Sequence, residues 1–153
     1  MITIFLYFMF LCESLFSMAF RTGISLNYQR DDVPFVKILT RKESIRHVVI
    51  EEPEKIQAIK DYINSLEIIE VRKVPANRFG SDVENYGWIS IYFGETRDHN
   101  PGDIIEFMSE YMGVSYNMRD WEGKNYFVKN SGFCSETKTS NIYYFLRDLI
   151  DEG

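Results

Sequence analysis

Four potential metal ligands lie close together in the second half of the sequence, on a segment rich in turn-forming residues. These residues are Glu95, Asp98, His99 and Asp103. Carboxylate oxygens on a tight turn can hold calcium, but the spacing here does not match the twelve-residue calcium-binding loop. A solvated turn between two strands explains the same residues, so we predict no metal site. A small metal-dependent hydrolase that uses the 95–103 loop is kept as an alternative function.

The motifs that usually mark catalytic sites are missing from the sequence. There is no glycine-rich phosphate loop, no Gly-x-Ser-x-Gly elbow, no His-Glu-x-x-His and no Cys-x-x-Cys. Glu106 and Glu110 would share a strand face at roughly 13 Å, which is too far for direct coupling of their carboxyl groups. The two histidines are far apart in the sequence, and we expect His47 to face solvent on a strand. We therefore favour a protein without enzymatic activity and predict no catalytic residue and no cofactor.

The composition predicts one folded domain with an acidic surface. Of 153 residues, 45% are hydrophobic and 16% are aromatic, which is enough for a single core and unlike the composition of a disordered chain. The formal net charge is −6, and the basic residues are not clustered. Nucleic-acid binding needs grouped lysine and arginine to neutralise phosphates, so we expect no nucleic-acid partner. Attachment to an anionic membrane surface is disfavoured for the same reason.

The first twelve residues are almost continuously apolar and contain no lysine or arginine. The run is too short to cross a bilayer without including Glu13, so we expect no stable membrane span. It is typical of the apolar core of a signal peptide, with small residues placed for cleavage before Phe20. We therefore predict a signal peptide over 1–19, a single domain over 20–153 and an extracytoplasmic protein, either secreted or periplasmic. A membrane-anchored or cytoplasmic protein is the alternative.

The two cysteines do not predict a disulfide framework. Cleavage before Phe20 would remove Cys12 and leave Cys134, and one cysteine cannot form an internal disulfide. We expect Cys134 to be a buried thiol, with an intermolecular disulfide as the alternative. A nucleophilic role lacks support, because neither histidine lies near Cys134 in the sequence.

The best-patterned strand in the sequence is predicted over residues 86–95, where side chains alternate between two faces. One face carries Ile89, Ile91 and Phe93, and the other carries Trp88, Ser90 and Tyr92. The stretch is rich in β-branched and aromatic residues and contains no proline, so we expect an inner strand of the sheet. Further strands are predicted at 33–40, 45–50, 68–74, 104–108, 111–116 and 125–130.

Two amphipathic helices complete the predicted fold. The first follows the acidic residues and proline at 51–53, and its apolar stripe leaves Lys55, Lys60, Asp61 and Asn64 on the solvent side. The second follows Ser140, which we expect to act as its amino-terminal cap. Residues 20–32 show no period and predict a loose lead-in segment. The fold class is therefore α+β, an antiparallel sheet of about five to seven strands with two amphipathic helices packed on one face.

An aromatic sheet face is the main functional lead. If the isoleucines of the 86–95 strand meet the helices, Trp88 and Tyr92 lie on the other face of the sheet. Tyrosine and tryptophan are enriched in interface hot spots. The candidate binding residues are Trp88, Tyr92, Tyr111 and Trp121, with Tyr116 and Tyr126 as further neighbours. The alternative is that these rings only pack across strands.

The function that these observations favour is a small exported protein that binds another protein. We expect this chain to act as an inhibitor or immunity-type protein that contacts its partner through the aromatic sheet face or the loop at 76–85. An intracellular interaction module, in which the first apolar segment belongs to the fold, is a second alternative besides the hydrolase.

Overall fold

The computed structural model describes residues 23–40, 47–72, 74, 87–95, 101–116 and 123–151 of the chain. Seven strands and two helices lie within these ranges. They are β1 (Val36–Thr40), β2 (His47–Ile50), α2 (Pro53–Ser65), β3 (Ile68–Val71), β4 (Ile89–Glu95), β5 (Pro101–Met108), β6 (Tyr111–Ser115), β7 (Lys124–Val128) and α3 (Asn141–Asp151). The predicted signal peptide, the 76–85 loop and Trp121 lie outside the described residues. The predicted α+β class with an antiparallel sheet is confirmed.

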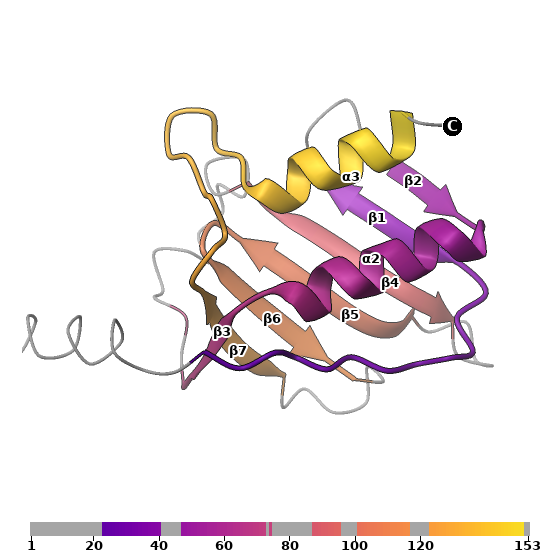
Figure 1. The fold of residues 1–153 in the computed structure, drawn as a ribbon, viewed down its shortest axis with the longest axis horizontal. Coiled ribbons are helices and arrows are strands. Elements are labelled where there is room, and N and C mark those ends of the chain that lie inside the picture. Colours follow the sequence, from indigo (N-terminus) through magenta and orange to yellow (C-terminus); the bar gives the residue numbers. More distant parts are fainter. Residues whose placement is uncertain are drawn as a thin grey trace, which may run out of the picture.

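The strands of the described ranges form one sheet in the order β2-β1-β4-β5-β6-β7-β3, and each neighbouring pair is antiparallel (Figure 1). From β4 to β7, each strand pairs with the next along the chain. β1 pairs with β2 and also with β4, which is therefore an inner strand. β3 pairs with β7 at the other edge, so α2 carries the chain from one edge of the sheet to the other.

The main hydrophobic core combines residues of the sheet with residues of both helices. In Figure 1, α2 and α3 lie side by side in front of the sheet. Alternate strand residues are buried with the apolar stripes of the helices, among them Ile38, Ile91, Ile105, Ile59 and Leu146. Ile91 lies between Ile38 and Ile105 in the strand register. Full burial of one such aliphatic side chain stabilises the fold by about 1.5–3 kcal/mol.

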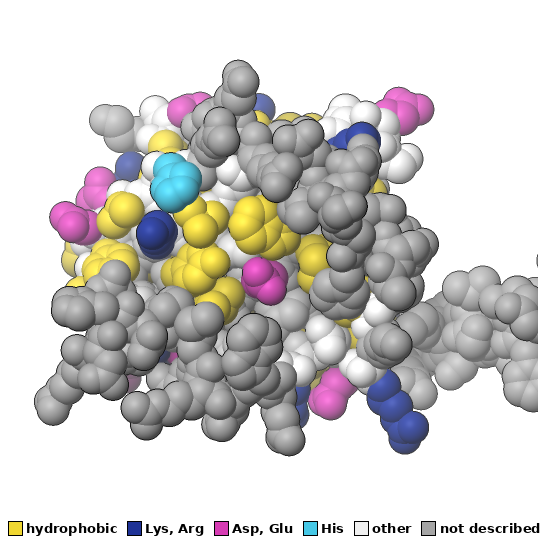
Figure 2. Space-filling view, turned by 180° about the vertical axis from the view of Figure 1, so that it is seen from behind, with side chains coloured by type: hydrophobic (Ala, Val, Ile, Leu, Met, Phe, Trp, Pro, Cys, Tyr) yellow, Lys and Arg dark blue, Asp and Glu magenta, His cyan; other side chains and the backbone are white. Residues whose placement is uncertain are grey.

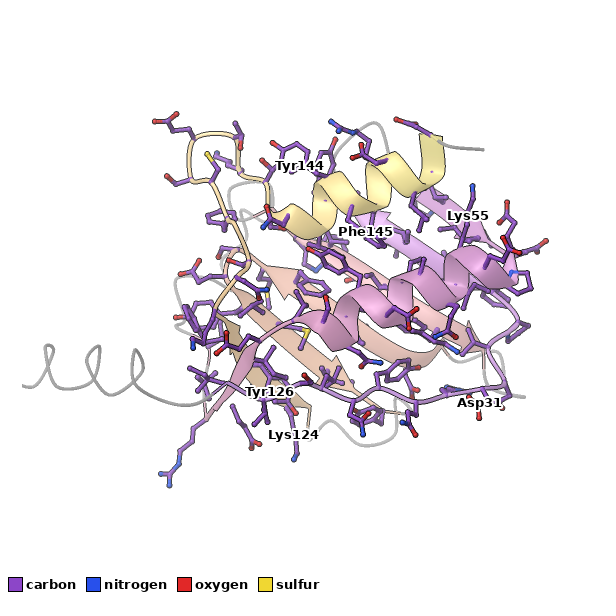
Figure 3. The ribbon with its side chains drawn as sticks, viewed as in Figure 1. Asp31, Lys55, Lys124, Tyr126, Tyr144 and Phe145 are labelled. Atoms are coloured by element: carbon purple, nitrogen blue, oxygen red, sulfur yellow. The ribbon has the colours of Figure 1, made fainter. Side chains whose placement is uncertain are left out.

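The two helices contact each other through aromatic rings. Phe145 points from α3 toward α2 in Figure 3, and its ring centroid lies 4.3 Å from that of Tyr62. α2 begins at Pro53, where the missing backbone donor costs nothing. Ser140 precedes α3 as expected, but its buried Oγ has no hydrogen-bond partner among the described residues. The predicted side-chain cap of α3 is therefore wrong.

Residues 23–35 form an ordered segment, which we call the strap, instead of the loose lead-in that the sequence predicts. Figure 1 shows the strap as the indigo segment that runs alongside α2. At one end, Ile24 exchanges two backbone hydrogen bonds of 2.9 Å with Ile68 at the start of β3. Further along, the Asn64 side chain accepts a hydrogen bond from the Tyr28 backbone N–H (2.6 Å) and donates one to its carbonyl (3.0 Å). Polar backbone groups of the strap are therefore satisfied by α2 and β3.

The strap also changes the environment of Lys60, which the helical pattern placed on the solvent side of α2. Lys60 is only 7% exposed, and its Nζ donates a hydrogen bond to the backbone carbonyl of Arg30. The prediction for Lys60 is wrong, because a segment from elsewhere in the chain covers this side of the helix. Its long apolar stem lies in the covered region while the ammonium reaches a polar partner.

Candidate functional site

The strand residues that alternate with the core residues point to the opposite side of the sheet, which we call the rear face. Figure 2 shows this side, where hydrophobic side chains gather in the middle with acidic atoms among them. Most rear-face residues are half-buried, and Val49 on the edge strand β2 is 56% exposed. By the strand register, the rear face comprises Lys37, Leu39, His47, Val49, Ile69, Val71, Ser90, Tyr92, Ile104, Glu106, Met108, Tyr111, Gly113, Ser115, Asn125 and Phe127.

Strand pairing arranges these side chains in rows that cross the sheet. The middle row consists of His47, Leu39, Ser90, Glu106, Gly113, Asn125 and Val71. The row on one side contains Tyr92 and Ile104, and the row on the other side contains Met108, Tyr111 and Phe127. The rings of Tyr111 and Phe127 form an edge-to-face pair with centroids 5.7 Å apart. The polar centre of the rear face thus lies between two rows that are rich in aromatic and aliphatic residues.

The structure places two of the four predicted binding residues on the same face of the sheet, in different rows. Tyr92 on β4 and Tyr111 on β6 both lie on the rear face, separated by β5. Trp88 is half-buried just before β4, and its carbonyl accepts a hydrogen bond of 2.9 Å from the Thr40 hydroxyl. Trp121 lies outside the described residues.

Two tyrosines that the sequence suggested as neighbours are placed elsewhere. Tyr126 is 5% exposed and belongs to the core cluster, because it lies opposite Met112 in the register of β6 and β7. Tyr116 follows β6 and is 45% exposed beside Tyr28, with the two rings nearly parallel and 6.4 Å apart. Neither tyrosine extends the rear face.

Glu106 and Ser90 form a polar pair at the centre of the rear face. The Ser90 hydroxyl, which is fully buried, donates a hydrogen bond of 2.8 Å to Glu106 Oε1. Burial, and next the negative charge of Glu106, raise the pKa of the Tyr92 hydroxyl above its ordinary value. The sequence suggests only Glu110 as a partner for Glu106 and does not link Glu106 to the aromatic face. The hydrophobic alternation of the two strands does not reveal this pair, because their pairing register decides which residues face each other.

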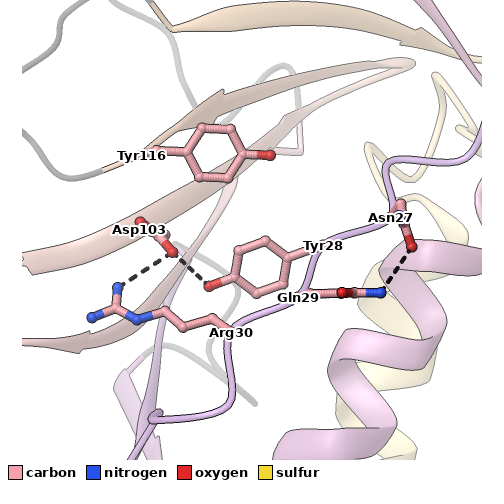
Figure 4. Close-up of a pocket in the computed structure, with 6 residues that line it drawn as sticks. All are labelled: Asn27, Tyr28, Gln29, Arg30, Asp103 and Tyr116. Atoms are coloured by element: carbon pink, nitrogen blue, oxygen red, sulfur yellow. Dashed lines mark hydrogen bonds and ion pairs between the residues drawn. The ribbon is translucent and has the colours of Figure 1, made fainter.

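A second polar cluster lies where the strap meets the start of β5, in a cleft of about 460 Å³ (Figure 4). Asp103 is 6% exposed and accepts a hydrogen bond of 2.8 Å from the Tyr28 hydroxyl. The guanidinium of Arg30 lies 3.3 Å from the same carboxylate. Burial, and next the hydrogen bond to Asp103, hold the pKa of Tyr28 well above its ordinary value. Position 102 needs glycine, since a Cβ there would lie 2.3 Å from the Phe93 carbonyl oxygen and 2.8 Å from the Arg30 guanidinium.

These contacts give Asp103 a structural role in holding the strap. The carboxylate that the sequence assigned to the 95–103 loop lies on strand β5 and already has a cation and a hydroxyl as partners. Asp98 and His99 lie outside the described residues, and no group of three potential metal ligands occurs within the described ranges. Sequence reasoning missed Tyr28 and Arg30 because the strap has no periodic pattern. An isolated tyrosine in a polar segment is the one local signal that could have marked Tyr28.

Cys134 is exposed, so the prediction of a buried thiol is wrong. It lies in the turn before α3, where its backbone N–H bonds to the carbonyl of Thr139 at 2.8 Å. Hydrogen bonds from the hydroxyl and backbone N–H of Thr137, and next from the backbone of Glu136, lower the pKa of the thiol. The sequence pattern of this turn gives no indication of thiol exposure.

Comparison of the chain with protein-family models, with curated proteins and with solved structures finds no match. Within the described ranges, neither helix has the length and apolar character that crossing a bilayer requires. The geometry described above is therefore the basis for a functional proposal.

Proposed function

We propose that this protein binds another protein through its rear face and has no catalytic role. The observation that carries the proposal is the composition of that face, where Tyr92, Ile104, Met108 and Tyr111 surround a small polar centre on adjacent strands. Apolar and aromatic side chains with a few fixed polar groups are typical of the centre of protein interfaces. Both helices pack on the opposite face in this proposal, which leaves the rear face to the partner.

We further propose that the chain is exported and acts outside the cytoplasm as an inhibitor or immunity-type protein. The apolar segment at 1–12 and the small residues before Phe20 support export. The net charge of −6 favours a partner with a basic surface, because complementary charge speeds encounter and discriminates between partners.

Site-specific photo-crosslinking in the native source tests the binding proposal. A photoreactive phenylalanine at position 92 should crosslink a distinct protein, whereas the same group at Gln57, an exposed position on α2, should not. Edman sequencing of the recovered chain tests export, for which we expect Phe20 as the first residue.

Mutational analysis with the crosslinked protein then measures the energy of the contact. Truncation of a hot-spot aromatic typically costs 2 kcal/mol or more, so Tyr92→Ala should weaken binding by roughly 30-fold or more. Gln57→Ala should leave the affinity within about twofold. Equal crosslinking at both positions, or an unchanged affinity for Tyr92→Ala, would contradict the proposal.

A further inference from the structure

We infer that Glu106 and the space above Gly113 form a receptor for one basic side chain of the protein partner. This inference rests on the proposed function and specifies the chemistry that the partner must present at the centre of the rear face. It depends on three features of the described residues: the surroundings of Glu106, the lack of a side chain at Gly113, and the amide of Asn125 beyond it.

The surroundings of Glu106 are largely apolar. Ile104 and Met108 share its face of β5, and Ser90 lies opposite it on β4. Ser90 donates the one hydrogen bond that Glu106 accepts within the described residues, and no described basic side chain forms an ion pair with it. Lys37 lies on the rear face too, but in the neighbouring row and two strands away.

The described residues leave space for a partner group on the other side of Glu106, where Gly113 lies opposite it on β6. Among the described residues, a Cβ built at Gly113 would meet only one atom within 4 Å, the Oδ1 of Asn125 at 3.8 Å. Gly113 is not among the described glycines with a positive φ, so its backbone does not require glycine. Glycine inside a strand often marks a place where another group approaches closely.

The two oxygen-bearing side chains flank this space. The Glu106 carboxylate lies on the β5 side of Gly113, and the Asn125 amide lies on the β7 side. A guanidinium or ammonium group above Gly113 could therefore donate hydrogen bonds to both, and charge-assisted bonds of this kind are the strong ones.

Electrostatics requires any partner that covers the rear face to supply a basic group next to Glu106. Docking strips water from Glu106, and a buried carboxylate without a cation is strongly unfavourable. A partner with only apolar side chains at this point would leave the charge unpaired. A partner that places arginine or lysine above Gly113 pairs the Glu106 carboxylate with a positive charge. The net negative charge of the whole chain also attracts such a partner.

A random twelve-residue peptide library displayed on phage, selected against the full chain, tests the inference. Some selected peptides should bind the parent chain but not the Tyr92→Ala variant. We expect these peptides to share one arginine or lysine, and its replacement by glutamine should weaken their binding to the parent chain by about 30-fold or more. Glu106→Gln should cause a similar loss, and Glu106→Lys should favour the peptide in which the basic residue is exchanged for glutamate. Glu70→Gln is the matched control, since Glu70 is an exposed acid of β3 on the other side of the sheet.

Gly113→Val separates the binding role from a structural one. Valine fills the space above Gly113 but suits a β-strand, so the urea-unfolding midpoint should be unchanged or higher while peptide affinity falls at least tenfold. Retained affinity in Gly113→Val would overturn the inference.

The remaining outcomes distinguish the inference from the proposed function. Peptides that need Tyr92 but bind equally well to Glu106→Gln would overturn the inference and leave the proposed function intact. Self-association of Glu106→Gln with unchanged peptide affinity would show that the carboxylate only keeps copies apart, which also overturns it. Selected peptides that are insensitive to Tyr92→Ala would count against the proposed function, and the inference would fall with it.

Discussion

Replacing Tyr28 with phenylalanine removes the hydroxyl that ties the strap to Asp103. The ring stays and keeps its contact with Phe93, whose centroid lies 4.8 Å away, so the substitution tests the hydrogen bond alone. A hydrogen bond to a charged group contributes about 1.5–3 kcal/mol. Asp103 retains Arg30 at 3.3 Å after the substitution, so we expect a loss at the lower end of that range, about 1.5 kcal/mol.

The same substitution has a second signature at alkaline pH. The pKa of Tyr28 is higher in the folded chain than in the unfolded chain, where a tyrosine titrates near 10. The stabilisation is therefore fully present below about pH 10 and is lost as the pH rises, by about 1.4 kcal/mol per pH unit for one group. Tyr28→Phe should make the alkaline decline of stability shallower by that amount above pH 10.

Urea unfolding followed by circular dichroism at pH 7 and between pH 10 and 11.5 measures both effects. Tyr144→Phe is the matched control, because Tyr144 is 39% exposed on α3 and its hydroxyl pairs with the neutral Thr139 hydroxyl at 3.2 Å, so the loss should be about 0.5 kcal/mol, the lower limit for a neutral hydrogen bond. A Tyr28→Phe protein with the stability of the parent at pH 7 and the same alkaline slope would refute the role that we assign to the hydroxyl.

Two further predictions concern residues that the structure places differently from the sequence pattern. Lys60→Met should lower the free energy of unfolding by about 1.5–3 kcal/mol in urea titrations, because it removes the charged donor to the strap. The control Lys55→Met, on the same helix, should change the free energy of unfolding by less than about 0.5 kcal/mol. In a Cys12→Ser background, the pH–rate profile of iodoacetamide alkylation at Cys134 should have a midpoint below the ordinary value of about 8.5, and Thr137→Val should raise it. A midpoint at or above the ordinary value would show that the turn does not stabilise the thiolate.

The sequence predicts those features of the fold that depend on residues within a single strand or helix. Alternation identified β4 as an inner strand and assigned Ile91 and Tyr92 to opposite faces, because side chains of a strand alternate strictly. The proline and acids at 51–53 located the start of α2 for the same local reason. The two helices and the antiparallel class follow from such local signals.

The sequence does not predict contacts that depend on distant segments. Lys60 reads as a solvent-facing residue because helical periodicity contains no information on the strap that covers it. Asp103 reads as a turn residue, yet β5 begins at Pro101, which is allowed at the first position of a strand. The pairing register of β4, β5 and β6 determines which residues lie next to Glu106 on the rear face. A shift of β5 by one residue would move Glu106 to the other side of the sheet.

The path of the chain through the sheet has a consequence for how the molecule can assemble. β4 to β7 need only short connections, whereas β1 must find β4 and β3 must find β7 across about fifty residues each. Closing such long loops costs entropy before any contact is gained, so these two pairings are the slow events. We expect the meander of β4 to β7 to form first. Because α2 joins β2 to β3, the addition of the β1–β2 pair at one edge brings β3 close to the other edge. Refolding on the millisecond-to-second scale is expected for a topology with so many distant pairings.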